Sequence, residues 1–456
     1  MTEQAATDGL ARQLIAARRW AGITQEQLAG LSTVSVRAIR DLEQGRVRHP
    51  RRETLRLLAD AMRLGDVRRA ALELAVEGAP ADSVMRDAFG AELAPPPEPL
   101  RRLVGRSEEL RALTGLLATE HERLLTVVGI AGVGKTRLAQ EAALLMHTRD
   151  RMPVLWVDME TAVPQPVSAT VRSPRAALTG WARSLAVGGP GLDELASVVG
   201  DRAALMVLDG HDAVPRLAPQ LLELLHGCER LKVLITAREP HRTPGNRLLP
   251  LAPLPLPAPQ PSADAASPLP GQSLTAGEPA VELMLSYVGH MRPDLLPTDS
   301  VVRTVARICH ALDAVPRAME SAASWLLLHS LEELLAIART SPLDLVDDAA
   351  LSDVNEEGLG ALLAAAVDRL DDIQATLLGD LGALADGWTA EQASAVLAVP
   401  AATVAREVHA LMLRGLVRRL PATGEGASRF GVLNLVRGLA ADRAQTTARQ
   451  SVALVH

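Results

Sequence analysis

The chain has 456 residues, more than a single hydrophobic core usually spans, so we expect two to four domains. Apolar residues make up 48% of the chain, but only 5 Trp, 2 Phe and 1 Tyr are aromatic, which favours helices with cores of Leu, Val and Ala. The net charge is −7, yet residues 1–75 hold 13 arginines against 9 acidic residues. These values exclude a single small module, and they place any contact with nucleic acid at the N-terminal end.

Targeting and redox features are weak in this sequence. No run of about 18 apolar residues occurs, and the first ten residues include Glu3 and Asp8 without an apolar stretch. We therefore expect no membrane span, no signal peptide and a cytoplasmic location. The two cysteines, Cys228 and Cys309, lie far apart with no His or Cys at metal-binding spacing, so we expect them to be small buried residues.

The N-terminal region has the pattern of a helix-turn-helix unit. Thr24 and Ser35 can cap two short helices, over residues 25–29 and 36–44, which a tight turn separates. In the DNA-binding motif of this spacing, the second helix enters the major groove by its N-terminal residues. The pattern predicts an all-α DNA-binding domain over residues 1–78.

Residues 22–29, 35–45 and 54–59 resemble the Cro/cI-like (XRE) helix-turn-helix family. The resemblance implies double-stranded DNA as a partner. The base readers that it implies lie in the second helix: Val36, Arg37 and Arg40. Ser35, which caps that helix, is a further predicted DNA contact. The phosphate contacts would come from a polar and basic set around it: Gln25, Arg46, Arg48, Arg51 and Arg52. A helical protein-binding module with a solvated arginine face remains an alternative.

Two proline-rich stretches divide the rest of the chain. Prolines mark a linker over residues 79–100 and a second connection over residues 253–278. Between them, residues 101–252 alternate apolar runs with helical patterns, which predicts an α/β domain with a parallel sheet. The expected strands cover residues 124–128, 154–157, 203–208 and 231–235. Beyond the second connection the pattern is helical, over residues 279–350 and 351–456.

The first of these strands leads into a phosphate-binding loop. Residues 129–136 fit G-x-x-x-x-G-K-[ST] between the strand and a helix expected over residues 137–147. The backbone N–H groups that would wrap phosphates belong to Gly129, Gly132, Val133 and Gly134. Lys135 would reach the β- and γ-phosphates, and Thr136 would bind Mg²⁺. Lys135 is one of two lysines in the chain, and we expect the other, Lys232, to be a solvated residue at a strand start.

An acidic residue and an arginine complete the predicted nucleotide site. Asp209 ends the third apolar run and would hold Mg²⁺. Asp212 is the nearest carboxylate that could orient an attacking water, but it could equally be an ordinary acid at a helix start. Arg238 follows the fourth strand and would sense the γ-phosphate, with a surface ion pair as its alternative role.

Residues 103–110, the phosphate loop, and residues 208–209, 236–240 and 251–257 resemble the STAND class of signal-transducing ATPases, specifically NB-ARC-like bacterial regulators. The resemblance implies ATP or ADP with Mg²⁺ as cofactors, a P-loop core, a helical lid over residues 279–350 and a winged helix over residues 351–456. Further nucleotide contacts that it implies are Val104, Gly105 and Arg106 at the adenine base, and Pro316 in the lid. Arg137, directly after the loop, is also predicted to contact the nucleotide. The family's Gly-Leu-Pro-Leu element reads Ala-Val-Pro-Arg over residues 314–317, and its Met-His-Asp element reads Val-Leu-Asn over residues 432–434. Leu433 cannot donate a side-chain hydrogen bond to ADP.

Together these features favour an ATP-binding transcriptional regulator in which the nucleotide state controls the N-terminal reader. Hydrolysis is expected to be slow, because the sequence identifies no second arginine beside Arg238 that would bind the phosphates. Two alternatives stay open: a sensor that binds nucleotide without hydrolysing it, and a defence-type signalling ATPase that oligomerises. A homodimer or higher homo-oligomer is a further expected partner. The winged helix could itself touch DNA, but the resemblance implies a regulatory role inside the molecule.

Overall fold

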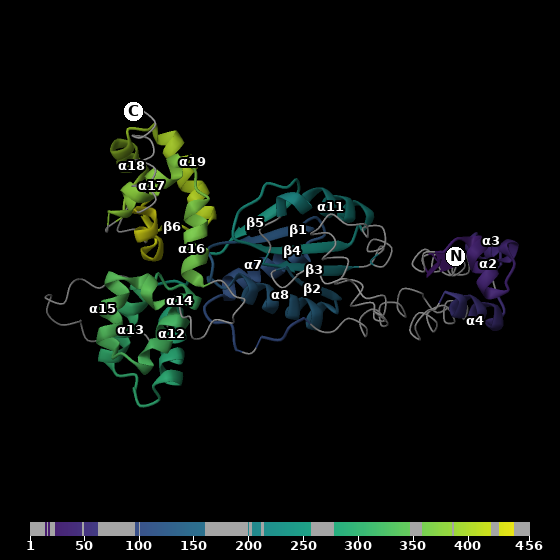
Figure 1. The fold of residues 1–456 in the computed structure, drawn as a ribbon, viewed down its shortest axis with the longest axis horizontal. Coiled ribbons are helices and arrows are strands. Elements are labelled where there is room, and N and C mark those ends of the chain that lie inside the picture. The colour runs from purple at the N-terminus through teal and green to yellow at the C-terminus, as the bar shows by residue number, and fades with distance from the viewer. Residues whose placement is uncertain are drawn as a thin grey trace.

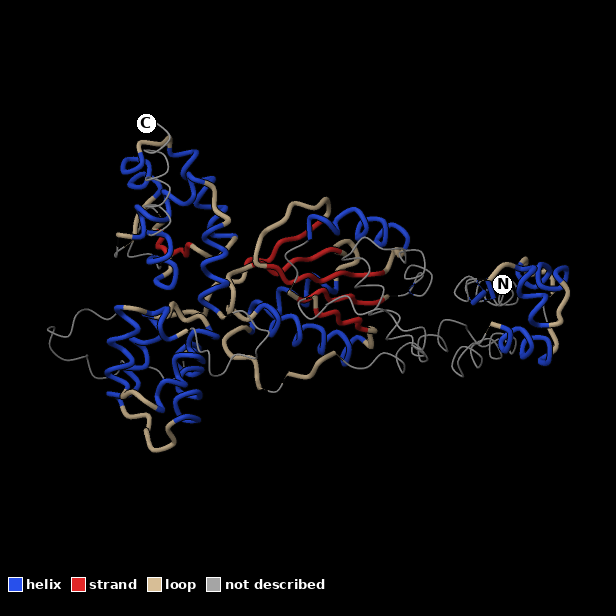
Figure 2. The backbone as a smooth tube through the Cα atoms, viewed as in Figure 1, coloured by secondary structure: helices blue, strands red, loops and turns tan. Residues whose placement is uncertain are grey.

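A computed structural model of the chain describes thirteen stretches of it. They are residues 14–15, 17–18, 23–47, 50–62, 96–99, 101–159, 199, 203–210, 214–256, 278–346, 358–384, 387–420 and 428–441. Figure 1 shows the elements that they form, and Figure 2 separates helices from strands along the same chain.

The N-terminal stretch forms a small helical unit. Its helices are α2 (Gln25–Ser32), α3 (Val36–Glu43) and α4 (Arg52–Ala61). The Thr24 hydroxyl accepts a hydrogen bond from the Gln27 N–H, and the Gln27 side chain accepts one from the Thr24 N–H, which closes a capping box. Ser35 caps α3 by accepting from the Ala38 N–H. The two caps thus lie at the starts of the two helices that the sequence predicts.

The middle of the chain forms a five-stranded sheet in which all strand pairs are parallel. The strands are β1 (Leu124–Val128), β2 (Val154–Asp158), β3 (Ala204–Asp209), β4 (Leu231–Ala237) and β5 (Asn246–Pro250), in the spatial order β2-β3-β4-β1-β5. This confirms the expected parallel α/β sheet. The sequence did not predict β5, which is an edge strand with mostly half-buried side chains.

Helices cover both faces of the sheet. Buried residues of α7 (Ser107–Ala118) and α8 (Lys135–Asp150) share one core cluster with alternate strand residues, and α11 (Val214–Gly227) shares another with the residues between them. Strands buried on both faces read as continuous apolar runs, which is why the sequence identified four of them. All five strands end at the same edge, so the loops that follow them lie together.

Two further parts follow the sheet in the chain. The central helical segment (residues 278–346) contains α12 (Pro279–Met291), α13 (Asp299–Ala311), α14 (Pro316–Ser324), α15 (Leu331–Thr340) and the short 3₁₀ helices η1 (Trp325–Leu327) and η2 (Pro342–Leu345). The C-terminal segment (residues 358–441) contains α16 (Leu359–Asp368), α17 (Asp372–Gly382), α18 (Ala390–Leu397), α19 (Ala401–Leu413) and an antiparallel pair, β6 (Val417–Arg419) and β7 (Phe430–Val432). Among the described residues no single helix is long and apolar enough to cross a membrane, although α18 and α19, bent by 112° at their junction, pass that test as a pair on length and composition alone.

Asp313 joins the central helical segment to the C-terminal segment. It is fully buried between α13 and α14 with a left-handed φ of 54°, a conformation that Asp tolerates better than most residues. Its Oδ2 accepts a hydrogen bond of 2.9 Å from the Leu435 N–H, and its Oδ1 lies 3.4 Å from a guanidinium nitrogen of Arg418. Nearby, the Asn434 side chain donates to the carbonyl oxygen of His310 at 2.9 Å. The two segments therefore share a buried polar contact.

The expectation that Lys232 is solvated is wrong. Lys232 lies inside β4 and is only 8% exposed. Its ammonium donates to the carbonyl oxygens of Thr119 and Glu122, at 2.5 and 3.2 Å, just after the end of α7. A cation at a helix C-terminus satisfies carbonyls that have no partner within the helix. Both cysteines are buried, as expected.

The buried Asp313 carboxyl should make stability depend on pH. Burial raises its pKa from the ordinary value of 3.8 to about 6, and the nearby Arg418 opposes that shift. The folded state therefore holds this proton more tightly than the unfolded state, so the free energy of unfolding falls as pH rises from about 4 to 6. The shift corresponds to about 3 kcal/mol.

Asp313→Asn keeps an acceptor for the Leu435 N–H and tolerates the left-handed backbone, but it does not titrate. Urea unfolding followed by tryptophan fluorescence at pH 4 and pH 7 checks the expectation. Between these two pH values, the free energy of unfolding of the wild type should fall by up to about 3 kcal/mol more than that of the variant. An equal pH dependence in both proteins would contradict it.

Candidate functional site

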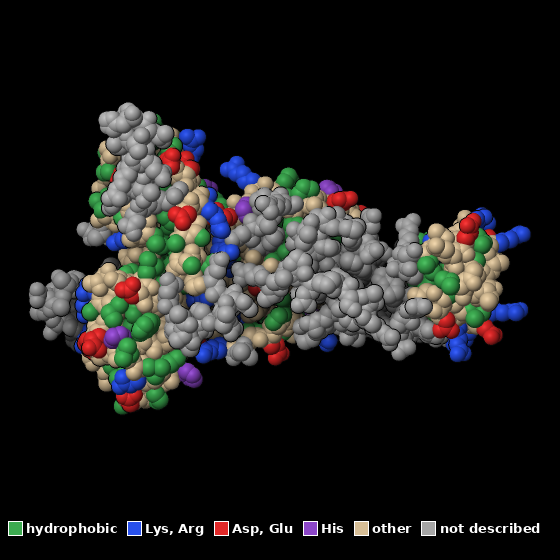
Figure 3. Space-filling view, viewed as in Figure 1, with side chains coloured by type: hydrophobic (Ala, Val, Ile, Leu, Met, Phe, Trp, Pro, Cys, Tyr) green, Lys and Arg blue, Asp and Glu red, His purple; other side chains and the backbone are tan. Residues whose placement is uncertain are grey.

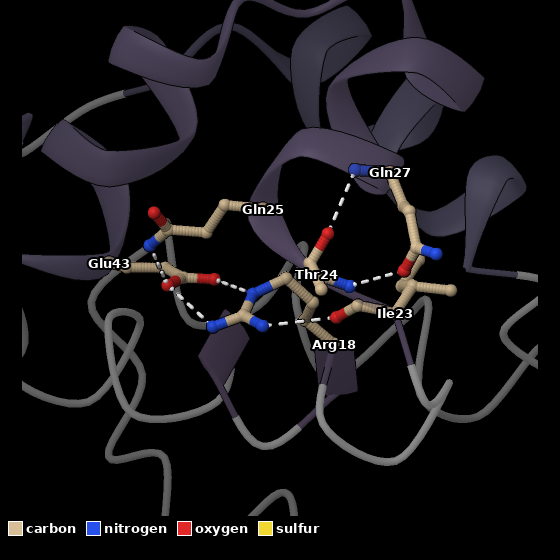
Figure 4. A network of polar contacts seen from close by, with 6 residues as sticks. All are labelled: Arg18, Ile23, Thr24, Gln25, Gln27 and Glu43. Carbon is tan, nitrogen blue, oxygen red and sulfur yellow. Dashed lines mark hydrogen bonds and ion pairs between the residues drawn. The ribbon is translucent and has the colours of Figure 1, made fainter.

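A buried ion pair holds the N-terminal helical unit together. The Arg18 guanidinium donates to both carboxylate oxygens of Glu43, at 2.5 and 3.0 Å, and to the carbonyl oxygen of Ile23 at 3.0 Å. The Gln25 amide donates to the same carboxylate at 2.6 Å. Figure 4 shows these side chains converging on the Glu43 carboxylate. The network joins the start of α2 to the end of α3, so it sets the angle at which α3 is presented.

The residues predicted to read DNA lie on the outer side of α3. Arg37 and Arg40 are exposed and Val36 is half-buried, so all three are accessible. Val36 and Arg40 also line an open surface depression with Gln25 at the start of α2. Figure 3 shows basic side chains, which are all arginines in this unit, projecting from it. The described and exposed members of the wider predicted set are Ser35, Arg46, Arg51 and Arg52, and Arg48 lies outside the described residues.

The Gln25 side chain contacts Glu43, whereas the resemblance implies a contact with a DNA phosphate. Its side chain is half-buried and donates to Glu43, so at least one amide hydrogen is directed into the protein. A phosphate contact by Gln25 therefore stays a prediction that would use its other hydrogen or its backbone N–H.

The phosphate loop runs between β1 and α8. Gly132 and Gly134 have φ values of 76° and 102°, which side-chain-bearing residues rarely adopt, and Gly134 is the cap residue of α8. A Cβ on Gly129 would lie 2.5 Å from the carbonyl oxygen of Leu251, so no side chain fits there. The Lys135 ammonium donates to the carbonyl oxygens of Gly129 and Ile130, at 2.9 and 3.0 Å. The carbonyl groups of the loop thus bind the ammonium of the loop's own lysine.

Asp209 stands at the carboxyl end of β3. Its Oδ1 accepts hydrogen bonds from the hydroxyls of Thr136, at 2.9 Å, and Thr236, at 2.6 Å. Burial raises the pKa of Asp209, the two threonine hydroxyls oppose that shift, nearby Asp158 adds to it, and Lys135 lowers it. The structure therefore brings together Thr136 and Asp209, the two residues predicted to hold Mg²⁺.

Asp158 is a nearby acid that the sequence did not identify. It ends β2 directly opposite Asp209 in the parallel register, and its side chain is exposed. The Met159 N–H donates to the carbonyl oxygen of Asp209 at 2.9 Å, which joins the two strand ends. Asp158 therefore brings a second carboxylate to this edge. Asp212, the acid named from the sequence, lies outside the described residues.

Arg106 is buried, but its contacts are with the protein. One guanidinium nitrogen donates to the carbonyl oxygens of Val133 and Ala252, at 3.2 and 2.7 Å, and another to Glu109 at 2.8 Å. Burial lowers the pKa of Arg106 and Glu109 opposes that shift. Gly105, with a φ of 68°, packs so closely on Pro279 that a Cβ would lie 2.3 Å from it. These contacts join the segment before α7 to the phosphate loop and to α12, while adenine binding by Val104, Gly105 and Arg106 stays a prediction.

Residues from far along the chain also reach the phosphate loop. The Arg317 N–H donates to the carbonyl oxygen of Gly132 at 3.2 Å, next to Pro316 at the start of α14. A Cβ on Gly415, after α19, would lie 2.9 Å from the backbone nitrogen of Ile130. The central helical and C-terminal segments therefore both contact this loop. The sequence missed Arg317 as a site residue, although it lies directly after the proline that the resemblance singled out.

An ion pair reinforces the contact of the C-terminal segment. Arg414 lies 2.9 Å from Glu239, and both side chains are largely buried. Glu239 directly follows Arg238, a half-buried residue at the carboxyl end of β4. The ion pair therefore joins the end of α19 to the edge of the sheet that carries the phosphate loop.

Residues 10–72 match the family model described as a helix-turn-helix domain. The match covers α2, α3 and α4. The N-terminal unit is a helix-turn-helix domain.

Relatives cover more of the chain. A protein of Mycobacterium bovis named as an HTH-type transcriptional regulator is 30% identical over 203 residues, which make up 44% of this chain and 20% of that protein. A protein of Mycobacterium tuberculosis with the same description has the same values. An uncharacterised protein of Mycobacterium bovis is 30% identical over 230 residues, 49% of this chain and 51% of the relative. The chain thus spans about a fifth of the length of the named regulators and about half of the uncharacterised protein.

The ion pair between Arg18 and Glu43 should be essential to the helix-turn-helix domain. Glu43→Ala leaves the Arg18 guanidinium, 15% exposed, without its carboxylate. Loss of one partner of a buried pair costs about 3 kcal/mol or more. Hydrogen exchange in α2 and α3 of the full chain should report a fall of that size in the opening free energy.

Asp41→Ala is the matched control, because it removes an ion pair with Arg46, whose side chain is 66% exposed. Exposed pairs contribute about 0–1 kcal/mol. Equal effects of the two substitutions would show that Glu43 has no special structural role.

Proposed function

We propose that this protein is an ATP-binding transcriptional regulator in which nucleotide bound at the phosphate loop controls DNA binding by the helix-turn-helix domain. The observation that carries the proposal is the 2.9 Å contact between Thr136 and Asp209, which joins the phosphate loop to a strand-end carboxylate in a chain that also holds a DNA-binding fold. The names of the mycobacterial relatives support the regulatory part.

The helix-turn-helix domain would bind double-stranded DNA through α3. Arg37 and Arg40 can donate bidentate hydrogen bonds to guanine, and Val36 can contact a thymine methyl group. The exposed arginines around them, including Arg46 and Arg51, would offset phosphate charge. Because Glu43 holds Arg18 and Gln25 at the base of α3, the reading side chains have a rigid support.

The phosphate loop fits a magnesium-bound nucleoside triphosphate. The N–H groups of the loop and of the α8 N-terminus form a cradle for phosphates, and the Lys135 ammonium lies within it. Thr136 and Asp209 offer the oxygen ligands that Mg²⁺ prefers. When bound, Mg²⁺ would offset the negative charge of the phosphates. Arg137 adds a buried guanidinium nitrogen that has no hydrogen-bond partner in the described part of the chain.

The residues for hydrolysis would be Asp158, Asp212 and Arg238. Asp158 or Asp212 would orient water, and Arg238 would bind the γ-phosphate from the end of β4. Asp209 is followed by Gly210, so the adjacent position offers no carboxylate. This arrangement is consistent with slow turnover.

Coupling would pass through the segments that contact the phosphate loop. The central helical segment would act as the lid, and the C-terminal segment as a winged-helix domain. Arg317 and Gly415 contact the loop, and Arg414 pairs with Glu239 beside Arg238. Nucleotide that favours one arrangement of these contacts would shift the population of states.

Arg37→Ala combined with Arg40→Ala should weaken specific DNA binding. Each lost base contact costs about 1–3 kcal/mol, or about 5- to 150-fold in affinity. A gel-shift assay on genomic fragments selected by the wild-type protein measures the change. The control is Arg339→Ala, an exposed arginine on α15. Wild-type affinity of the double variant for these fragments would refute the assignment of α3 as the reader.

Lys135→Ala should lower the affinity for Mg-ATP by about 10- to 150-fold, because it removes a charged hydrogen-bond donor to phosphate. Lys135→Arg should also lose most of the affinity, since a planar guanidinium does not replace the compact ammonium in the loop. Calorimetric titration measures both, and thermal melting without nucleotide checks the fold. Unchanged ATP binding in both variants would refute the nucleotide site.

Two further measurements test whether nucleotide controls DNA binding and whether the protein hydrolyses ATP. Genome-wide footprints of the wild type and Lys135→Ala should differ if nucleotide controls DNA binding. A steady-state assay in which the wild type turns over no more ATP than Lys135→Ala would favour a sensor that does not hydrolyse its nucleotide.

A further inference from the structure

Arg317 occupies a position that no assigned role explains. It is the second residue of α14, and its backbone N–H donates to the carbonyl oxygen of Gly132 in the phosphate loop at 3.2 Å. A Cβ built on Gly132 would lie 2.8 Å from the Cβ of Arg317. The root of an arginine side chain is therefore packed directly on the loop, although this residue comes from a separate helical segment.

The surroundings of Arg317 favour an interaction with phosphate. Its side chain is half-buried, and the apolar side chains of Val315 and Leu359 approach Gly132 on the same side. A charged hydrogen bond is stronger where apolar groups exclude water. The N-terminus of α14, a helix of nine residues, adds its positive dipole end. A basic side chain and a helix start thus face one turn of the loop.

The place of Gly132 in the loop indicates which phosphate Arg317 would meet. The first N–H groups of α8, at Lys135 and Thr136, would hold the β-phosphate. Gly132 precedes that helix start, so a side chain packed against it would lie beyond the part of the loop that would hold the β-phosphate. The terminal phosphate of a nucleoside triphosphate would lie there.

On the basis of the proposed nucleotide site, we infer that the Arg317 guanidinium binds the γ-phosphate of ATP and distinguishes ATP from ADP. The planar guanidinium can donate two parallel hydrogen bonds to phosphate oxygens. Because Arg317 belongs to α14 and not to the sheet, a contact made only with the triphosphate gives the central helical segment a different free energy in the two nucleotide states. Such a difference is what a ligand needs to shift a conformational equilibrium.

The test compares the affinities of the full chain for ADP and for the non-hydrolysable analogue AMP-PNP, both with Mg²⁺, by calorimetric titration. Arg317→Met keeps an aliphatic stem against Gly132 and keeps the backbone hydrogen bond, but it removes the charge. It should weaken AMP-PNP binding by about 10- to 150-fold and change ADP binding by less than about twofold. Arg317→Lys should restore part of the loss. Arg339→Ala, on the same segment, should change neither affinity.

Three outcomes would overturn the inference. Wild-type affinity of Arg317→Met for AMP-PNP would exclude the contact. An equal loss for ADP and AMP-PNP would show a role in packing or in β-phosphate binding. Full loss in Arg317→Lys with an unchanged melting temperature would exclude a charge contact with the γ-phosphate.

The proposed function fails separately from this inference. If the wild type bound neither nucleotide, or if Lys135→Ala bound both like the wild type, the nucleotide site itself would be wrong. If binding depended on Lys135 but not on Arg317, only the role of Arg317 would be lost. Melting temperatures with ADP and with AMP-PNP give a second readout, because a ligand raises the melting temperature in proportion to the logarithm of its affinity.

Discussion

The Asp209 carboxylate is the point at which the sheet domain is joined to its phosphate loop. It accepts hydrogen bonds from Thr136, at the start of α8, and from Thr236, at the end of β4. The parallel register places these residues at one edge, and the Gly210 N–H donates to the Thr236 hydroxyl at 2.8 Å. Because the carboxylate is buried, these donors stabilise a charge that burial opposes. The same two hydroxyls therefore stabilise the ionised form of Asp209 and join it to the loop.

Close packing at glycines joins this edge to the central helical and C-terminal segments. Gly132 and Gly415 both have left-handed backbones, and each lies in a contact where a side chain would clash. Interfaces without spare volume move as a unit or separate, because they do not deform continuously. A shift of the phosphate loop would thus displace Arg317 or Gly415, and the buried contact of Asp313 would carry that displacement between the two later segments.

The sequence predicted the parts of the fold whose signals are local. Four strands were identified because each is buried on both faces, and the caps at Thr24 and Ser35 located α2 and α3. β5 was missed because an edge strand that ends in Pro250 is only half-buried and reads as part of a proline-rich stretch. Lys232 was misplaced because a lysine at a strand start normally reaches water, and only the position of α7 shows which carbonyls it satisfies.

The residues of the candidate site also fall into those that the sequence predicted and those that it did not. The loop from Gly129 to Thr136 and the acid Asp209 are recognisable by pattern. Asp158 and Arg317 are not, because strand register places the first and packing between separate segments places the second. For Arg106 the resemblance implied a base-binding residue, while the structure shows a guanidinium that donates to the carbonyl oxygens of Val133, within the loop, and Ala252, after β5. A motif thus identifies the residues that meet a ligand through the backbone better than those that arrive from another element.

The separate core of the helix-turn-helix domain limits how nucleotide could control DNA binding. Its buried residues form a cluster of their own, distinct from the two clusters of the sheet and the later segments in the described part of the chain. The angle of α3 is set inside this unit by Glu43, Arg18 and Gln25. Nucleotide at the phosphate loop would therefore leave the reading surface itself unchanged. Control would instead act on the access of this surface to DNA or on the pairing of two copies, since two linked readers gain affinity from the effective concentration of the second.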